Sequence, residues 1–431
     1  MAGLRGLAHV AVVGYAGPVE GQLSGRQRVF LAGQAVSLLG DGLAFLAVPL
    51  LVLELSRNPL VSALSAASVT IGYLLVGLPS GALIDRFDPL RVLMAMDAAR
   101  LLLFTALFAF AQAGLLRVWL ILTVGIVSGA CSVFFQTALV VAVRDLFPLS
   151  ALLGANSAME LANQVSFVLG PAAVGVLAAT AGLHLALLVD ALTFLVSLLS
   201  LACVRSRSAH ARDRPPPLRL AALRHEIREG FRYLLSVRLL VTLTVMQMAV
   251  NLCLSVEKLI FYYARDTLRL SSFPVSIIVA AGGAGGILGA LTAAPLARRV
   301  GQIRLIAAAI GACGIAVAAM SAATSFAGLL LANLAYLWAL VVAGLVNRTQ
   351  RQQSIPRELL GRVTGTVRLL FLAVEPLGVI IAGTLTAALD NDPRLVFLGS
   401  GTLVTITAVT GWFLGLRTRT RSSVAGVTEG A

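Results

Sequence analysis

Two acidic residues stand deep inside long apolar stretches of this sequence, where an ionised side chain is unfavourable. Asp41 lies about twelve residues into the run 29–55, which is roughly 18 Å along a helix that rises about 1.5 Å per residue. Glu375 precedes Pro376 in another apolar run. A carboxyl group away from water can exchange a proton reversibly, so both residues are candidates for proton binding. The alternatives are a structural hydrogen bond for Asp41, and a pair with Arg368 or a bound cation for Glu375.

Polar and aromatic residues in other apolar runs could line a cavity. Gln247 and Asn251 are one helical turn apart, so they would share a helix face. The candidates for cavity lining are Phe45, Phe135, Glu160, Asn163, Gln164, Gln247, Asn251 and Phe371. Hydrogen bonds between helices, for the polar residues, and lipid or packing contacts, for the aromatic residues, are the alternatives.

A further charged pair has a spacing that favours contact. Asp97 and Arg100 are three residues apart and can pair on one helix face, as a structural or gate-supporting contact. The role of Asp190, a third acid within an apolar run, is left open by the sequence.

The composition shows what kind of element must position these residues. The chain has 431 residues, of which 58% are hydrophobic and only 12% are charged. Soluble domains carry about 25% charged residues, so lipid is the solvent that fits this sequence. The net charge of +14 comes mainly from arginines in short loops between apolar runs, which argues against nucleic-acid binding. The four cysteines have no metal-ligand spacing, and we expect no metal and no cofactor.

Twelve apolar runs are long enough to cross a membrane as helices. They are 29–55, 62–83, 92–113, 116–142, 154–180, 183–204, 238–256, 273–296, 303–324, 326–346, 362–388 and 395–416. With the N-terminus inside, 25 of the 33 lysines and arginines fall on the inner side and 6 on the outer side. This bias predicts a multi-pass protein of the inner or plasma membrane with both termini in the cytoplasm.

The runs fall into two groups of six. We expect a cytosolic tail 1–28, an N-terminal bundle 29–204, a basic linker 205–237, a C-terminal bundle 238–416 and a cytosolic tail 417–431. The linker contains an amphipathic stretch that would lie on the lipid surface or pack under the bundle. The stretches 78–93 and 292–306 align with each other, as do 168–177 and 373–385, six runs apart in both cases. This shared offset indicates duplicated halves.

The loop after the second run carries the most specific motif. Gly81 is followed by Asp85 and Arg86 and then by Arg91. This pattern resembles the loop signature of the major facilitator superfamily. The resemblance implies a gate latch formed by Gly81, Asp85, Arg86 and Arg91 and supported by Asp97 and Arg100. Arg298 stands where the second copy would place the acid, so the latch would be one-sided.

A second motif lies in the fifth run. Gly170, Pro171 and Gly175 resemble the antiporter motif of drug exporters in that superfamily, with Ala173 and Val174 at positions that are usually smaller or more flexible. Gly-Pro would kink the helix, and Gly175 would allow tight packing. A simple kink is the alternative. The stretches 33–55, 154–171 and 354–363 resemble the branch that contains macrolide-efflux and enterobactin-exporter proteins.

These resemblances imply an all-α membrane fold of two six-helix bundles and transport by alternating access, not catalysis. The expected function is proton-coupled export of a small hydrophobic or amphipathic compound, such as a drug, an antibiotic or a natural product. A siderophore exporter, a lipid or lysolipid translocator and a membrane sensor that does not transport are the alternatives. The expected partners are the small-molecule substrate, protons and the lipid bilayer, and we expect the chain to act as a monomer.

Overall fold

The computed structural model describes residues 23–57, 59–84, 86–180, 182–205, 220–390 and 392–416. Helices make up almost all of these residues, and a helix occupies most of each of the twelve predicted ranges. Within the described ranges, ten helices are long and apolar enough to cross a membrane, and a bent pair can provide an eleventh. The remaining helix of the twelve, α3, has 26 residues. The gate-latch residue Asp85 lies outside the described residues, as do most of both tails and much of the linker.

The chain divides into two compact units. The first consists of Met1–Phe231 and Ile355–Thr366, and the second consists of Arg232–Ser354 and Val367–Ala431. The long helices of the first half are α2 (Gly25–Ser56), α3 (Pro59–Ile84), α4 (Pro89–Gln112), α5 (Val118–Leu146), α6 (Leu152–Thr180) and α7 (Leu185–Arg205). Those that follow are α8 (Leu220–Ser236), α9 (Arg238–Leu254), α11 (Ser272–Val300), α12 (Gln302–Ser321), α13 (Phe326–Ser354), α14 (Leu360–Ala388) and α15 (Arg394–Gly411). Residues 360–366, at the start of α14, therefore belong to the first unit, and the rest of the helix belongs to the second.

The sequence explains where several of these helices begin. Ser24 caps α2 and exchanges hydrogen bonds with Gln27, which satisfies backbone donors at the helix start. Asp88 caps α4 by accepting from the backbone N–H of Leu90, and Pro89 occupies the first turn, where no N–H is needed.

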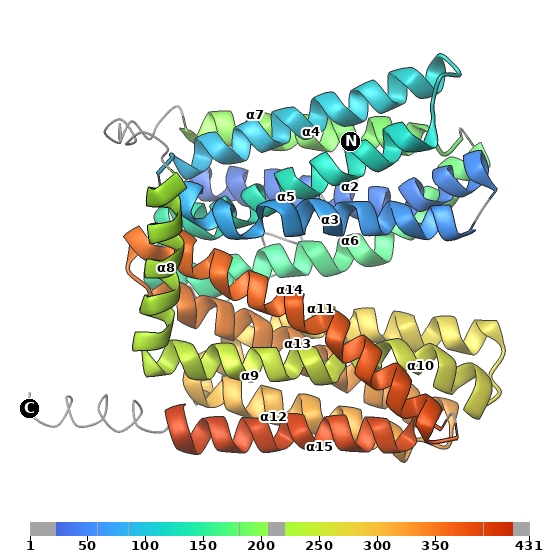
Figure 1. The fold of residues 1–431 in the computed structure, drawn as a ribbon, viewed down its shortest axis with the longest axis vertical. Helices are drawn as coiled ribbons and strands as arrows, with labels where there is room; N and C mark the ends of the chain where they lie inside the picture. Colours follow the sequence, from blue (N-terminus) through green and yellow to red (C-terminus); the bar gives the residue numbers. More distant parts are fainter. Residues whose placement is uncertain are drawn as a thin grey trace, which may run out of the picture. The chain divides into compact units, whose positions relative to one another are not determined.

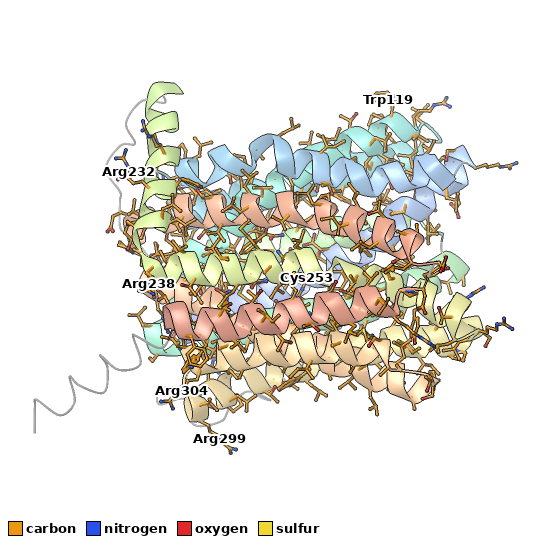
Figure 2. The ribbon with its side chains drawn as sticks, turned by 60° about the horizontal axis from the view of Figure 1, so that its bottom comes forward. Trp119, Arg232, Arg238, Cys253, Arg299 and Arg304 are labelled. Atoms are coloured by element: carbon orange, nitrogen blue, oxygen red, sulfur yellow. The ribbon has the colours of Figure 1, made fainter. Side chains whose placement is uncertain are left out.

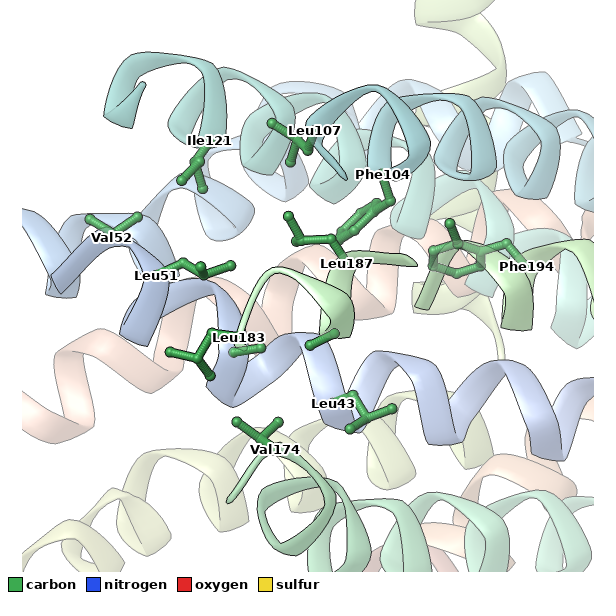
Figure 3. Packing of buried hydrophobic residues seen from close by; sticks show 13 residues of the cluster. Leu43, Leu51, Val52, Phe104, Leu107, Ile121, Val174, Leu183, Leu187 and Phe194 are labelled. Atoms are coloured by element: carbon green, nitrogen blue, oxygen red, sulfur yellow. The ribbon is translucent and has the colours of Figure 1, made fainter. Parts of the chain in front are cut away.

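Packing within the first unit follows the apolar faces of its helices. α2 packs against α6 and α7, α3 against α5, and α4 against both α5 and α7. Between them lies an apolar core that includes Leu43 and Leu51 of α2, Phe104 of α4 and Leu187 and Phe194 of α7 (Figure 3). This core fixes α2, α4 and α7 against one another, and these three helices carry the buried charges described below.

The same neighbour pattern recurs in the second unit. α11 packs against α13, α12 against α13 and α15, and α9 against α15. With α9, α11, α12, α13 and α15 matched to α2, α3, α4, α5 and α7, each of these pairs has a counterpart in the first unit. The repeated pairing agrees with the duplication inferred from the two sequence matches.

The seventh span differs from the sequence prediction, which ended it at residue 256. After α9 the chain continues through a 3₁₀ turn (Ser255–Lys258), a short helix α10 (Leu259–Tyr262) and a π-helical turn (Tyr263–Thr267). The described end of α8, Arg228–Ser236, is bent by 100° from α9, so α8 runs across the axis of α9 (Figure 1). An amphipathic helix perpendicular to a span is the orientation expected at a membrane surface.

Candidate functional site

A buried arginine stands at the centre of the first unit. Arg100 of α4 is almost completely buried. Its guanidinium carbon lies 4.5 Å from the ring centre of Phe135 on α5 and 4.3 Å from that of Phe194 on α7. A planar cation between two aromatic faces is held by electrostatic attraction and by packing. Phe135, predicted as cavity lining, thus contacts Arg100.

Two carboxylates contact this guanidinium. Arg100 Nη2 donates to Asp97 Oδ1 at 2.8 Å, and Arg100 Nη1 lies 3.6 Å from Asp41 Oδ1. The Asp97 side chain is fully buried, whereas the Asp41 side chain is 48% exposed. From the sequence, Asp41 is a candidate for proton binding or a structural hydrogen bond, and Asp97 and Arg100 are expected to form a structural or gate-supporting pair. The structure brings all three residues together.

A third carboxyl group lies beside them on α7. Asp190 is fully buried, and Thr193 donates to its backbone oxygen at 2.7 Å. A Cβ atom at Gly40 would lie 2.5 Å from Asp190 Oδ1, so the glycine before Asp41 allows α2 to approach Asp190 closely. Among the described residues, neither Asp97 Oδ2 nor Asp190 Oδ2 has a hydrogen-bond partner. We call Asp41, Asp97, Arg100 and Asp190 the Arg100 cluster.

The predicted gate region lies at the end of the first unit where α3 stops and α14 starts. A Cβ atom at Gly81 would lie 2.5 Å from the backbone oxygen of Gly361, so the two backbones touch there. Asp88 Oδ2 lies 3.7 Å from Arg91 Nε and 3.8 Å from Arg205 Nε. Arg86 follows α3 in the turn that leads to α4.

Two ion pairs in the same unit were not anticipated from the sequence. Arg357 pairs with Asp145 at the end of α5, and Arg362 pairs with Glu229 of α8. Both arginines belong to the segment 355–366, which is distant in sequence from the rest of the first unit. The signal that could have indicated them is the mixture of basic and acidic residues in 354–363, which include Arg357, Glu358 and Arg362.

The two glycines of the fifth-run motif have different surroundings in α6. A Cβ atom at Gly170 would lie 2.4 Å from the backbone oxygen of Gly42, so α6 and α2 are in backbone contact. Gly175 is exposed, and no described atom lies within 4 Å of such a Cβ, so the expected tight packing is absent there among the described residues. Pro171 stands inside α6, which continues to Thr180.

The other predicted polar residues make local contacts. Gln164 donates to Glu160 at 2.8 Å within α6, where Asn163 is half-buried. Phe45 is exposed, and its ring centre lies 5.7 Å from that of Phe167.

In the second unit, Gln247 donates to Asn251 at 3.3 Å and accepts from Asn347 at 3.2 Å. The guanidinium of Arg351 lies 5.2 Å from the ring centre of Phe371. Glu375 lies in α14, and its side chain is outside the described part of the structure.

Comparison with known proteins decides the family. The sequence model of the Major Facilitator Superfamily matches residues 30–374. The chain belongs to this superfamily. It is a multi-pass membrane transporter and not an enzyme, in agreement with the sequence prediction.

Curated relatives of this transporter include efflux proteins. The multidrug efflux pump Tap of Mycolicibacterium fortuitum is 27% identical over 81% of this chain and 86% of its own length. Tap of Mycobacterium tuberculosis (strain ATCC 25618 / H37Rv) is 28% identical over 84% and 87%. The enterobactin exporter EntS of Shigella flexneri is 26% identical over 87% and 88%. These similarities match the exporter branch expected from the sequence.

Solved structures show the fold alone. A bacterial homologue of the iron transporter ferroportin in an outward-facing state has a TM-score of 0.72 and 20% identity, covering 90% of this transporter and 99% of that chain. The proton:xylose symporter XylE has a TM-score of 0.70 and 13% identity, covering 91% and 96%.

Proposed function

We propose that this transporter exports small hydrophobic or amphipathic compounds in exchange for protons, and that the Arg100 cluster carries the coupling proton. The observation that carries the proposal is the excess of carboxyl groups over guanidinium groups in the cluster. Asp41 on α2 and Asp97 on α4 contact one buried arginine, and Asp190 on α7 lies beside Gly40 of α2.

The imbalance makes proton binding favourable. Burying a charge without a partner costs several kcal/mol, and each added proton removes one negative charge from the cluster. A full set of ionised carboxylates would leave an excess of two negative charges beside Arg100. Proton binding by the cluster would therefore reduce this excess of buried negative charge.

Access to the cluster runs through Asp41. Its side chain is the exposed member, whereas Asp97 and Asp190 are buried. Protonation of Asp41 would weaken its electrostatic attraction to Arg100. Arg100 would then be stabilised mainly by Asp97 and the two aromatic rings. A contact between α2 and α4 that depends on a proton is a local switch from which transport can be driven. Glu375 is the second candidate for this role, because it is the other acid that the sequence places deep in a span.

The proposed orientation places both termini in the cytoplasm. In the second unit, Arg232, Arg238, Arg299 and Arg304 gather toward the same end of the helices (Figure 2). Basic residues at one end of a set of spans mark the cytoplasmic side.

Relatives favour two substrate classes. The name of Tap specifies multidrug efflux and that of EntS specifies enterobactin export, so drugs and catechol siderophores are the classes to compare. We place drugs first, because the two Tap proteins cited above are slightly more similar to this chain.

The test is proton release from inverted membrane vesicles that contain the transporter, followed with a pH-sensitive dye. Macrolides, cationic dyes and catechol compounds are added in turn. We expect substrate-evoked release from the wild type and its loss in Asp41→Asn. Asp390→Asn is the matched control, because Asp390 is exposed in the turn after α14. If Asp41→Asn still releases protons on addition of substrate, Glu375 becomes the candidate for the coupling residue. If the wild type releases no protons with any of these compounds, proton-coupled export of these classes is contradicted.

A further inference from the structure

The surface that α7 presents to α2 is polar, although both helices lie within apolar runs. Four buried polar residues of α7 are three or four positions apart, which places them on one face of the helix. They are Asp190, Thr193, Ser197 and Ser200. A Cβ atom at Gly33 of α2 would overlap Ser200 Oγ, and one at Gly40 would overlap Thr193 Oγ1, so α2 approaches this face closely. Polar groups that meet at this depth need hydrogen-bond partners within the protein, because lipid supplies none.

Donors from this surface are directed toward Asp97 of α4. Gln34 of α2 is 2% exposed and donates from Nε2 to Ser197 Oγ at 3.1 Å. The Ser197 hydroxyl in turn faces the side chain of Asp97, to which Arg100 donates at 2.8 Å. Because Ser197 accepts from Gln34, its own proton is available to an acceptor on the Asp97 side. A carboxylate that faces two donors is suited to remain ionised, since the ionised form only accepts hydrogen bonds.

Asp190 has different surroundings, although it is also fully buried. Thr193 donates to its backbone oxygen at 2.7 Å and lies 3.5 Å from its Oδ1 atom, whereas its Oδ2 atom has no hydrogen-bond partner among the described residues. Two charged residues act on it electrostatically, Asp41 of α2 and Arg100 of α4. An ionised Asp41 repels a second carboxylate, and Arg100 already contacts Asp41 and Asp97. A bound proton would remove the unfavourable buried charge at Asp190.

We propose that Gln34 and Ser197 keep Asp97 as the permanently ionised partner of Arg100, so that Asp190 carries the exchangeable proton of the Arg100 cluster. This inference rests on the proposed function and assigns the coupling proton to one of the three carboxyl groups. Gln34 and Ser197 are positioning residues, because they act through Asp97. Asp41, which has the exposed side chain, is the group through which Asp190 exchanges its proton.

The test is infrared spectroscopy of the purified full-length transporter in detergent micelles at neutral pH, without substrate. Protonated carboxyl groups have a carbonyl stretching band that carboxylates lack. We expect the wild type to show this band, Asp190→Asn to lose it and Asp97→Asn to retain it. A band that is lost in Asp97→Asn and retained in Asp190→Asn would overturn the proposal, as would a wild type that lacks the band.

Ser197→Ala tests the positioning role. Without this hydroxyl group, ionised Asp97 loses a donor, so a further protonated-carboxyl band should appear as the pH is lowered, at a higher pH than in the wild type. Ser197→Thr keeps the hydroxyl group and should restore the wild-type titration. Ser200→Ala is the matched control, because Ser200 lies on the same face one turn later and donates to the backbone oxygen of Ser197 at 2.7 Å. Identical titrations of the wild type and Ser197→Ala would contradict the role of Ser197.

The vesicle assay separates this inference from the proposed function. If wild-type vesicles release no protons and the band still depends on Asp190, coupled export is contradicted and the assignment of the proton to Asp190 stands. If release depends on Asp41 and the band depends on Asp97, coupled export stands and the assignment to Asp190 is overturned.

Discussion

Arg100 shows why one residue can hold several helices together. Its side chain is on α4 and contacts a carboxylate on α2, another on α4 itself and aromatic rings on α5 and α7. The planar guanidinium matches this environment, since it can stack between rings while its edge donates hydrogen bonds. A lysine would keep the charge and could still donate a hydrogen bond, but it has no planar group to stack between the rings.

Arg100→Lys should therefore lower the stability of the transporter by about 1–3 kcal/mol, through weaker stacking and a less well satisfied Asp97. The measurement is the thermal unfolding midpoint of the purified protein in detergent micelles. Arg117→Lys is the control, since Arg117 is exposed before α5. Equal midpoints for the two variants would show that Arg100 does not contribute through its planar geometry.

At the scale of elements, backbone contact between helices depends on particular glycines. Gly170 brings α6 against Gly42 on α2, whereas Gly175, one and a half turns later, faces open space among the described residues. Both positions belong to the same sequence motif. They differ in their surroundings, which a motif does not encode.

Gly170→Ala should destabilise the transporter by about 1–3 kcal/mol, because its Cβ would overlap the backbone of Gly42 and force α2 and α6 apart. Gly175→Ala should be neutral or slightly stabilising, since alanine favours a helix by up to about 1 kcal/mol over glycine. Thermal unfolding of both variants provides the comparison. A greater loss at Gly175 than at Gly170 would contradict the observed packing.

The end of the first unit shows how elements distant in sequence are joined. Residues 355–366 belong to that unit, through the Gly81–Gly361 backbone contact and the pairs of Arg357 with Asp145 and Arg362 with Glu229. The predicted latch at Gly81 thus has a described neighbour, the start of α14. The roles of Arg86 and Arg91 in gating remain predictions.

At the scale of the whole molecule, the proposed topology can be tested by labelling. In a Cys203→Ser background, where the other three cysteines are buried, Arg304→Cys should react with a membrane-impermeant maleimide only in inverted vesicles. Leu115→Cys, in the turn between α4 and α5, should react only in intact cells. The reverse pattern would place the termini outside. Reaction of both positions from the same side would contradict the assignment of the spans that lie between residues 115 and 304.

The sequence by itself determined the membrane fold, the family and the approximate positions of most spans. Apolar runs of about 20 residues and arginines in the loops between them are local properties, and a bilayer leaves a helix few other ways to satisfy its backbone. For the same reason, the sequence could identify Asp41, Asp97, Arg100, Asp190 and Glu375 as unusual residues, because each stands among apolar neighbours.

Only the tertiary structure decided which of these residues lie close together. Asp41, Arg100 and Asp190 are far apart along the chain and meet because apolar faces of α2, α4 and α7 pack around a common core. Glu257 was assigned to a loop because hydropathy falls at Ser255–Lys258, yet Tyr336 binds it at the midpoint of an apolar run. Hydropathy reports the average over a segment, whereas the position of a single carboxylate depends on a partner that lies on another helix.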